Sequence, residues 1–324
     1  MSITRRNLLF STAAMATGLA ASASSAVHVL GATGGQAFGS TWRLAWSGAA
    51  SEEAVRSHVL RVVEQTNASM SPYRSESELS LFNRSRSSGW QHVSPDLSVV
   101  VSDALAVSRL TEGAFDPTVG PLVARYGFGP ISGGRGKLED LHIGAGALRK
   151  ITPDLTLDLC GIAKGYALDR IIGGLADLGV RSALLELGGE VRCIGQHPDG
   201  RPWRVGIERP DAADGAMQRI IAPRDLALAT SGTGRQGAAF GPHGISHLID
   251  PGHRRPVSGA PASVSVLAES AMRADALATA LMVMGPETGP DFARDHAIRA
   301  LFLRYHGNGW QEIMTAGFDR HLIL

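Results

Sequence analysis

The chain has 324 residues, with 31 Lys+Arg against 30 Asp+Glu, a formal net charge of +1 and an apolar fraction of 44%. No cluster of basic residues forms an electrostatic footprint for nucleic acid, so that class of partner is excluded. The length suffices for one large or two medium domains with a hydrophobic core. The two cysteines, Cys160 and Cys193, do not make a metal site by themselves; they could pair or stay as buried thiols.

Residues 1–26 have the organisation of an export signal. Arg5 and Arg6 precede an apolar, Ala-rich run that ends in small residues around Ala21 and Ala26. The paired arginines indicate the twin-arginine route, with an ordinary secretory signal as the alternative. The apolar run is too short and too rich in small residues to span a membrane, and no cysteine is present for a lipid anchor. We therefore expect a periplasmic protein that does not span the membrane, with its catalytic domain in residues 27–324.

The hydrophobic patterns predict an α+β protein, because strands outnumber helices and do not alternate strictly with them. Strand, helix and strand over 155–187 are expected to form one crossover unit. The predicted elements are, in chain order, a strand over 36–46, helices over 52–68, after 72 and over 95–111, a turn-rich stretch over 113–123, a strand over 155–159, a helix over 162–178, strands over 182–187, 203–208, 226–230 and 263–267, a helix over 270–284 and a final strand near 299–305.

Gly31, Gly34 and Ala37 have the spacing of a dinucleotide-binding fingerprint, but the surrounding sequence does not fit one. That motif needs a strand before it and a helix after it. Here the glycines follow the signal and run into a predicted strand that includes Phe38 and Trp42. A flexible mature N-terminus is the better interpretation, and the sequence context argues against a nicotinamide oxidoreductase.

The run from Leu157 to Asp169 is the most informative single segment. An apolar strand pattern ends on Asp158, turns through Gly161 and restarts as a helix with Lys164 in its first turn. A helix N-terminus attracts anions, and Lys164 could reach a phosphate, although the run lacks the Ser or Thr and the glycines of a P-loop. A surface lysine after an ordinary turn is the alternative.

Three downstream segments carry further candidate groups. Asp275 and Thr279 lie one helical turn apart on one face, and their hard oxygens suit Mg²⁺ when phosphate and water complete the shell. A solvated Asp and a Thr bonded to its own helix backbone are the alternative. His247 and Asp250 share a turn in which the histidine could act as a general base, with a structural Asp-Pro turn and an incidental histidine as the alternative. Residues 230–234 are small, polar and glycine-rich, so they could line a phosphate or form an ordinary loop.

The order of these segments, rather than any one of them, resembles the ApbE family of FAD:protein FMN transferases, over about residues 38–303. The resemblance rests on the following blocks: Phe38-Gly39-Ser40-Thr41, Ser71-Pro72-Tyr73 with Glu78-Leu79 and Phe82-Asn83, Gly113 to Thr118 with Gly120-Pro121-Leu122, Asp158-Leu159 with Gly161, Lys164 to Ala167 and Asp169, Leu187 to Glu190, Ala229 to Gly232, His247 to Pro251, and Ala274 to Thr279.

This resemblance implies an α+β, T-fold-related fold of mixed sheets flanked by helices, forming a single catalytic unit. It implies Mg²⁺-dependent transfer of FMN from FAD, the substrate, to a Thr or Ser hydroxyl of an acceptor flavoprotein, with a phosphoester formed and AMP released. The implied metal ligands are the Gly161 carbonyl, Asp275 and Thr279, and His247 is the candidate base. The implied flavin-site residues are Phe38, Tyr73, Ala114, Phe115, Asp116, Asp158, Lys164 and Ile249.

The chain departs from the family pattern in three places. Phe38 stands where Met is usual, Thr233 and Gly234 follow the Ser-Gly block in place of Asp and an aromatic residue, and the signal is of the twin-arginine type rather than that of a lipoprotein. The last trait resembles the branch that matures the membrane-bound flavoprotein regulator of nitrous oxide respiration, which makes such a protein a candidate acceptor. A non-catalytic periplasmic FAD carrier and an FAD pyrophosphatase remain the alternatives.

Overall fold

The computed structural model describes residues 30–134, 136–211, 215–232, 246, 248–257, 262–306 and 309–323. Its centre is one eight-stranded sheet with the strand order β1-β2-β6-β7-β10-β13-β14-β15, and every ladder in it is antiparallel. The strands are β1 (Leu30–Ala37), β2 (Ser40–Ser47), β6 (Ser182–Leu187), β7 (Glu190–Ile194), β10 (Ala227–Gly232), β13 (Ser263–Ala268), β14 (Arg299–His306) and β15 (Gly309–Met314).

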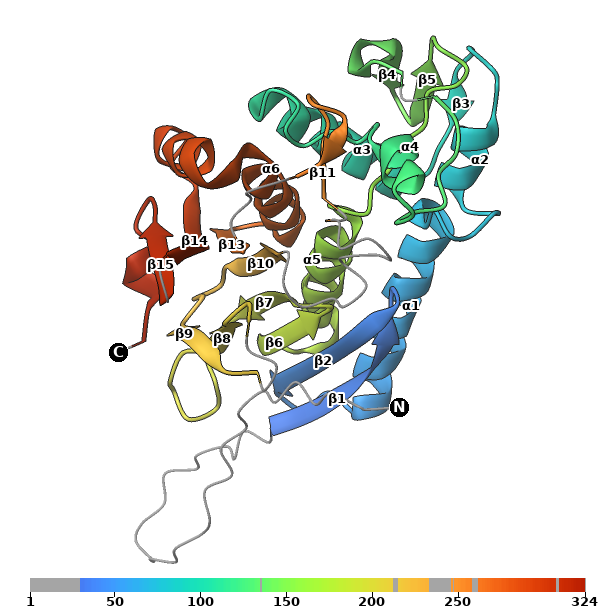
Figure 1. Ribbon diagram of the computed structural model, residues 1–324. Helices are drawn as coiled ribbons and strands as arrows, with labels where there is room; N and C mark the ends of the chain where they lie inside the picture. The colour runs from blue at the N-terminus through green and yellow to red at the C-terminus, as the bar shows by residue number, and fades with distance from the viewer. Residues whose placement is uncertain are drawn as a thin grey trace, which may run out of the picture.

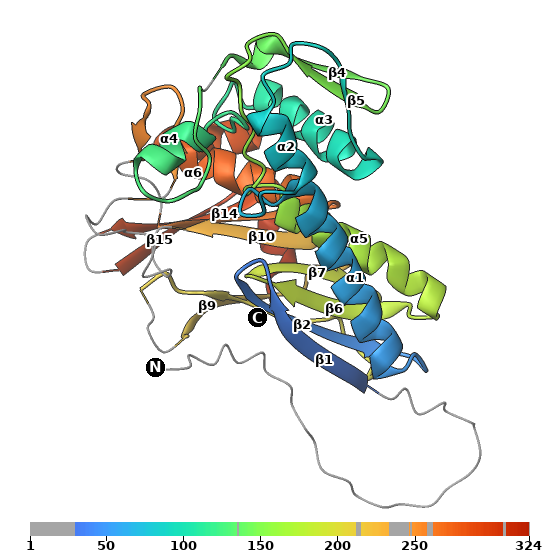
Figure 2. The same ribbon diagram turned by 90° about the vertical axis from the view of Figure 1, so that its right-hand side faces the viewer.

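Helices cover one face of this sheet (Figures 1 and 2). They are α1 (Glu52–Met70), α5 (Ala163–Leu175), continued by the turn η2 (Ala176–Leu178), and α6 (Ala271–Asp295), while α3 (Pro95–Leu110) packs outside them. The buried residues of these helices and of the facing strand positions form one large apolar core. Within α6 the helix breaks at Gly285, whose φ of 84° is non-helical, so the predicted helix over 270–284 ends where the structure bends.

A smaller lobe lies above the helices (Figure 2). It contains the short helices α2 (Glu78–Arg84) and α4 (Gly120–Arg125), the turn η1 (Leu138–Asp140), and a three-stranded antiparallel sheet of β3 (Gln91–His92), β5 (Ala147–Lys150) and β4 (Leu141–Gly144). The hairpin of β11 (Ile249–Asp250) and β12 (Arg255–Pro256) lies beside α6 in Figure 1.

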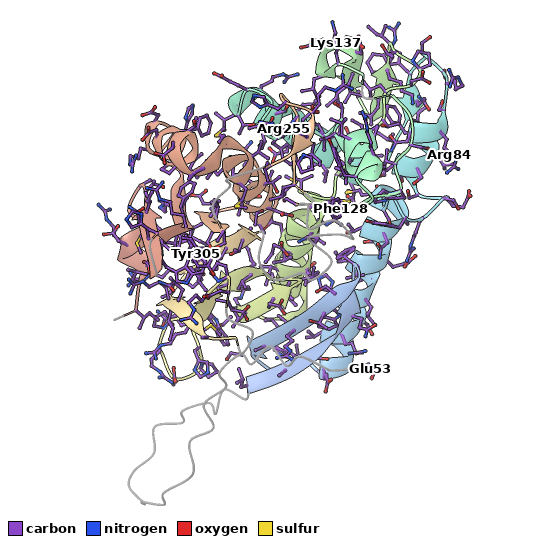
Figure 3. The ribbon with its side chains drawn as sticks, viewed as in Figure 1. Glu53, Arg84, Phe128, Lys137, Arg255 and Tyr305 are labelled. Carbon is purple, nitrogen blue, oxygen red and sulfur yellow. The ribbon has the colours of Figure 1, made fainter. Side chains whose placement is uncertain are left out.

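The second face of the sheet has a core of its own, covered by the hairpin of β8 (Val205–Glu208) and β9 (Met217–Ile221) and by the C-terminal turn η4 (Phe318–His321). Because both faces are covered, β6 is buried along almost its whole length. Tyr305, which Figure 3 labels, is 63% exposed on β14, at the end of the sheet remote from β1.

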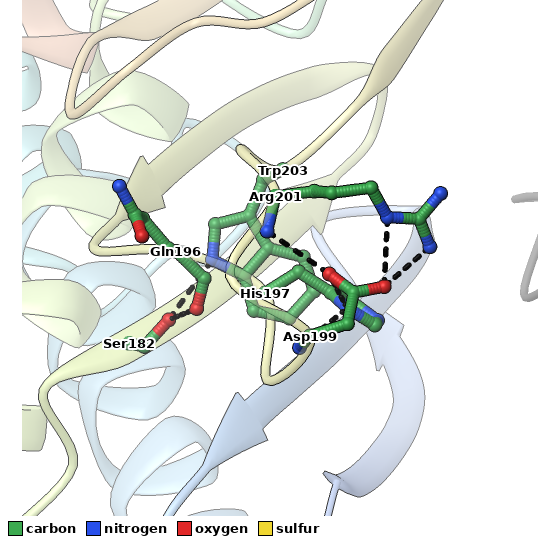
Figure 4. Close-up of polar contacts among 6 residues, drawn as sticks. All are labelled: Ser182, Gln196, His197, Asp199, Arg201 and Trp203. Atoms are coloured by element: carbon green, nitrogen blue, oxygen red, sulfur yellow. Dashed lines mark hydrogen bonds and ion pairs between the residues drawn. The ribbon is translucent and has the colours of Figure 1, made fainter.

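The loop before β8 is held by its own polar contacts (Figure 4). Asp199 pairs with Nδ1 of His197 at 2.9 Å and accepts from Nε of Arg201 at 2.8 Å. Trp203 donates to the hydroxyl of Ser182 at 3.1 Å and so fixes the loop to β6. These contacts close a turn and pin it to the sheet.

The structure confirms the α+β class and the predicted helices α1, α3, α5 and the first part of α6. The prediction of a strand over 155–159 is wrong, and no crossover unit forms. Leu155, Leu157 and Leu159 are buried, but Leu155 makes only an isolated bridge. The amide side chain of Asn83 binds both the N–H and the carbonyl of Leu157 at 2.8 Å, where a neighbouring strand would have bound them.

The interpretation of residues 30–37 as a flexible N-terminus is also wrong, since they form β1. The glycines that suggested a nucleotide loop lie against tryptophans of β2: a Cβ on Gly31 would fall 2.4 Å from the ring of Trp46, and one on Gly35 would fall 3.0 Å from Nε1 of Trp42. They are small because large rings pack across them. Likewise 299–305 is not the last strand, because β15 follows β14.

Candidate functional site

Two hairpin turns lie together at one end of the main sheet. The β1–β2 turn consists of Phe38 and Gly39, which have φ values of 51° and 72°, and the β6–β7 turn consists of Gly188 and Gly189. Trp42 pairs with Leu187 across the adjacent strands, and the Gly188 N–H donates to the Thr41 carbonyl at 2.9 Å. This arrangement places Phe38 at the sheet end from which the remaining groups project.

The first turn of α5 meets these hairpins through an ion pair between Lys164 and Glu190. Glu190, which begins β7, is only 4% exposed, and its Oε1 accepts from the Lys164 ammonium. Its Oε2 is buried and has no hydrogen-bond partner among the described residues. A buried carboxylate oxygen without a donor is costly. It therefore marks a place where a ligand group could donate.

The ammonium of Lys164 stays charged in this environment. Burial by itself disfavours the charged form, but the carboxylates of Glu190 and Asp275 outweigh it and raise the pKa of Lys164 above its ordinary value. The start of α5 thus carries a positive charge, and contact of Lys164 with a phosphate stays a prediction.

Helices α5 and α6 approach closely at Gly165. A Cβ there would fall 2.2 Å from the carbonyl oxygen of Ala271, so only glycine permits the contact. The Gly165 N–H donates to Oδ2 of Asp275 at 3.2 Å. Asp169, one turn further along α5, accepts from the Ala271 and Met272 N–H groups at 2.9 and 3.0 Å and so caps α6. The two helices are therefore held in one register.

Asp275 is a buried carboxylate, 4% exposed. Burial raises its pKa to about 7 and the charge of Glu190 adds to the rise, while Lys164 and the Gly165 N–H oppose it. A cation beside this carboxylate would favour its ionised form.

Gly161 lies between Phe115 and Thr279. A Cβ on Gly161 would fall 3.2 Å from Cε2 of Phe115 and 3.3 Å from Oγ1 of Thr279. The Thr279 hydroxyl also lies 3.4 Å from the hydroxyl of Ser231, at the end of β10. The structure thus brings the Gly161 backbone, Asp275 and Thr279 into one neighbourhood, although more than a hundred residues separate Gly161 from the other two.

The turn that carries Ala114, Phe115 and Asp116 packs on the same segment. Asp116 is buried and accepts from the backbone N–H and the hydroxyl of Thr118, both at 2.7 Å. The Asp158 N–H donates to the Pro117 carbonyl at 2.7 Å, and Oδ1 of Asp158 accepts from the Cys160 N–H at 2.9 Å. Both carboxylates shape the backbone around Gly161, and Asp158 stays half-exposed.

Tyr73 and Ile249 occupy different surroundings. Tyr73 is 70% exposed, and partial burial together with the charges of Cys160 and Asp158 raises the pKa of its phenol. Ile249 is buried in β11. In the same hairpin Asp250 accepts from the ring and the backbone N–H of His253 at 2.7 and 3.0 Å, so its carboxylate closes a turn.

Some predicted positions cannot be placed. His247, Thr233 and Gly234 lie outside the described residues, as do the signal and the cleavage zone in 1–26. Cys160 is exposed and Cys193 is buried, and both are free thiols. None of the helices in the described part of the chain is long and apolar enough to cross a membrane.

The sequence identifies two further groups of the site to different degrees: Glu190 is not among the predicted site residues, and Ser231 lies in the run 230–234, which could line a phosphate or form an ordinary loop. The signal for Glu190 was an acid immediately after a glycine pair, at a position that proved buried. The signal for Ser231 was the small polar run at the end of a strand. Neither pattern identifies a site until the partner, Lys164 or Thr279, is known to be in contact.

The fold and this group of residues agree with what is found for similar proteins. Residues 38–302 match the model of the ApbE family, and the chain belongs to that family. A Vibrio cholerae relative named FAD:protein FMN transferase is 38% identical over 319 residues, covering 91% of this chain and 92% of the relative.

Solved structures agree with this assignment. The flavin transferase ApbE from Vibrio cholerae superposes with a TM-score of 0.83 at 37% identity, covering 91% of this chain and 100% of that one. The flavinyl transferase ApbE of Pseudomonas stutzeri, in its apo form, gives a TM-score of 0.80 at 32% identity, covering 91% and 97%.

Proposed function

We propose that this chain is an FAD:protein FMN transferase that moves FMN from FAD to a Thr or Ser hydroxyl of an acceptor flavoprotein. The observation that carries the proposal is the meeting of Asp275 and Thr279 with the Gly161 backbone, beside the charged Lys164. Relatives that match along nearly the whole chain bear the name of this activity.

The donors at this place fit Mg²⁺. This ion is usually held by one or two carboxylates, with substrate phosphates and waters completing an octahedron. Asp275 supplies one carboxylate, Thr279 a hydroxyl and Gly161 a carbonyl. The position of a Gly161 Cβ is within 3.3 Å of Oγ1 of Thr279, so a side chain there would crowd the hydroxyl. Mg²⁺ bound to these groups would neutralise charge on the pyrophosphate of FAD.

The transfer is a displacement at phosphorus. The acceptor hydroxyl oxygen forms a bond to the phosphorus of the FMN half, the bond from that phosphorus to the bridging oxygen breaks, and AMP leaves with the bond electrons. We assign His247 as the group that takes the hydroxyl proton, and Lys164 as a fixed positive charge for the phosphates. Catalysis of this kind depends on positioning and charge.

The flavin would lie near the turn of Ala114, Phe115 and Asp116. Flat rings prefer aromatic or apolar neighbours, which Phe38, Tyr73 and Ile249 can offer from three other elements. Asp158 orders the backbone before Gly161 through the Cys160 N–H. With these assignments, the proposed flavin site is formed by residues of the smaller lobe and residues at the end of the main sheet.

The place of action that we propose is the periplasm, reached by twin-arginine export of residues 1–26. That route carries folded proteins, so the chain would leave the cytoplasm with its site formed. The proposed acceptor is a flavoprotein of the membrane electron-transfer type, for which the flavin-binding domain of a nitrous oxide respiration regulator is a suitable probe.

The test combines the purified mature chain, FAD, Mg²⁺ and that acceptor domain, with in-gel flavin fluorescence and AMP release as readouts. Asp275→Asn retains the volume and an oxygen for the Gly165 N–H but removes the charge, so we expect no labelled acceptor. Asp291→Asn is the matched control, because it makes the same change in the segment of α6 beyond Gly285, where 76% of the Asp291 side chain is exposed. Wild-type protein that releases free FMN without labelling the acceptor would indicate a pyrophosphatase, and binding without AMP would indicate a carrier.

A further inference from the structure

The strand β1 forms one edge of the main sheet. Its pairing with β2 runs without a register shift from Leu30 opposite Ser47 to Ala37 opposite Ser40. Among the described residues no strand pairs with its other side, and Figures 1 and 2 show it outermost in the sheet. Such an edge presents unpaired N–H and carbonyl groups to any extended segment that reaches it.

The turn geometry identifies the outward groups. A two-residue turn with positive φ at both Phe38 and Gly39 is of type I′, so the closing pair of Ala37 and Ser40 exchanges both backbone hydrogen bonds. Because bonded and non-bonded pairs alternate, residues 30, 32, 34 and 36 direct their N–H and carbonyl groups outward. The contact of Arg56 with the Gly34 carbonyl at 2.5 Å agrees with this assignment.

Helix α1 covers part of this edge, because it contacts β1 and its Arg56 donates to the Gly34 carbonyl, but β1 itself lacks most of the features that usually protect an edge. Its sequence, LGATGGQA, contains no charged residue and no proline, and its ladder has no bulge. The Gly34 carbonyl held by Arg56 still has a second lone pair. The opposite edge differs, because Glu312 of β15 pairs with Arg219 of β9 at 2.9 Å. Among the described residues no strand pairs with the outer side of either edge strand, and β1 differs from β15 in carrying no charged side chain of its own.

The β1 edge is also held in shape. Gly31 and Gly35 lie directly against the rings of Trp46 and Trp42, which are almost completely buried. An edge fixed in this way loses little conformational freedom when a partner strand binds.

β1 leads into the site. The strand ends at the Phe38 turn, and Ser40 lies just beyond this turn. A Cβ on Gly188 would fall 3.6 Å from Cβ of Ser40, 3.5 Å from Oε2 of Glu190 and 3.7 Å from Cδ of Lys164. Five residues paired along β1 extend about 17 Å. A chain laid on this edge would therefore deliver its next residues to the ion pair of Lys164 and Glu190.

We propose that the acceptor protein docks by adding an extended segment to the outer edge of β1, which carries its Thr or Ser hydroxyl to the site. This inference rests on the proposed transfer function. Main-chain hydrogen bonds to the outward groups would supply affinity with little demand on the acceptor sequence, as in other cases of strand addition.

The test removes one outward N–H. Ala32 is exposed, and proline is tolerated at an edge where the N–H faces solvent, so Ala32→Pro deletes a docking donor without touching the β1–β2 ladder. Ala32→Ser keeps the N–H and serves as the matched control. With the flavin-binding domain of the nitrous oxide respiration regulator as acceptor, we expect Ala32→Pro to raise the KM for the acceptor about tenfold. The Kd for FAD should stay within twofold of wild type.

A second measurement keeps the inference falsifiable if Ala32→Pro does not fold. Amide hydrogen exchange on the wild-type chain should show protection of residues 30–36 when the acceptor domain is added. Unchanged acceptor KM in a folded Ala32→Pro, or no protection of β1, overturns docking at this edge while wild-type transfer stands. If the wild-type chain sediments as a dimer and Ala32→Pro sediments as a monomer, the edge binds a second copy of the chain, and docking of the acceptor at this edge is also overturned. Absence of wild-type transfer would instead overturn the proposed function.

Discussion

Replacing Gly161 by alanine should cost more in activity than in stability. The backbone of Gly161 is not in the left-handed region, so alanine is conformationally allowed there, and the effect comes from the added methyl group. That group would lie 3.2 Å from Phe115 and 3.3 Å from the Thr279 hydroxyl. Each neighbour must move by a few tenths of an ångström, and both movements occur at the proposed metal site.

The magnitudes follow from the packing. Overpacking of this kind costs about 1–3 kcal/mol, and each kcal/mol lowers Tm by about 2–4 °C in a domain of roughly this size. Misplacement of groups at a reacting centre costs up to about 100-fold in rate. We therefore expect Gly161→Ala to fold, to melt a few degrees lower, and to transfer FMN about 10- to 100-fold more slowly.

The control is Gly173→Ala in α5, where an added Cβ meets no atom within 4 Å. It should gain about 0.5–1 kcal/mol from helix propensity and keep the wild-type rate. Initial rates of acceptor labelling at saturating FAD and Mg²⁺, together with thermal melts, measure both effects. A Gly161→Ala enzyme with the wild-type rate would refute the placement of Gly161 in the site.

Three further perturbations test the structure around the site. Gly165→Ala places a methyl 2.2 Å from the Ala271 carbonyl, so the α5–α6 contact should open at a cost of about 3 kcal/mol or more, and an unchanged Tm would contradict this packing. Glu190→Gln removes the carboxylate that pairs with the Lys164 ammonium and should lower the free energy of unfolding by about 3 kcal/mol. The double variant Lys164→Met with Glu190→Gln should recover most of that loss. Thermal melts of the single and double variants measure both effects, and additive effects would contradict the ion pair. Burial lowers the pKa of Lys150 to about 8, so between about pH 8 and 10.5 the unfolded chain binds more protons than the folded one. The free energy of unfolding should therefore rise with pH in this range, by up to about 1.4 kcal/mol per pH unit. Urea denaturation of Lys150→Met should lack this rise, and parallel stability–pH profiles for the variant and the wild type would show that Lys150 titrates normally.

Helices were predictable from the sequence because their signals are local. Ser51 and Ser94 cap α1 and α3 through their own hydroxyls, Gly179 ends the α5 segment in the left-handed region, and the apolar spacing of each helix matches its buried face. The same local logic placed Asp275 and Thr279 on one face of α6, and the family blocks suggested what they could hold.

Strands were less predictable because their hydrogen-bond partners are remote. Leu155, Leu157 and Leu159 alternate as a strand does, yet Asn83 and Lys150 satisfy the backbone there, with Lys150 donating to the Leu155 carbonyl at 2.9 Å. Conversely, the glycines of β1 are not typical of a strand, and the tryptophan rings that pack against them lie on β2. Only the tertiary structure distinguishes these cases.

The sequence alone determined which residue types the site could use: an acid and a hydroxyl one turn apart, and a lysine at a helix start. The fold decided their neighbours. Gly165 lets α5 and α6 come close enough for a backbone N–H to hold Asp275, which places Asp275 at the start of α5, near Gly161 and Lys164. The buried Glu190 enters the site from a hairpin on the sheet. Contacts of this kind depend on how two helices and a sheet pack, and no local pattern in the chain encodes that distance.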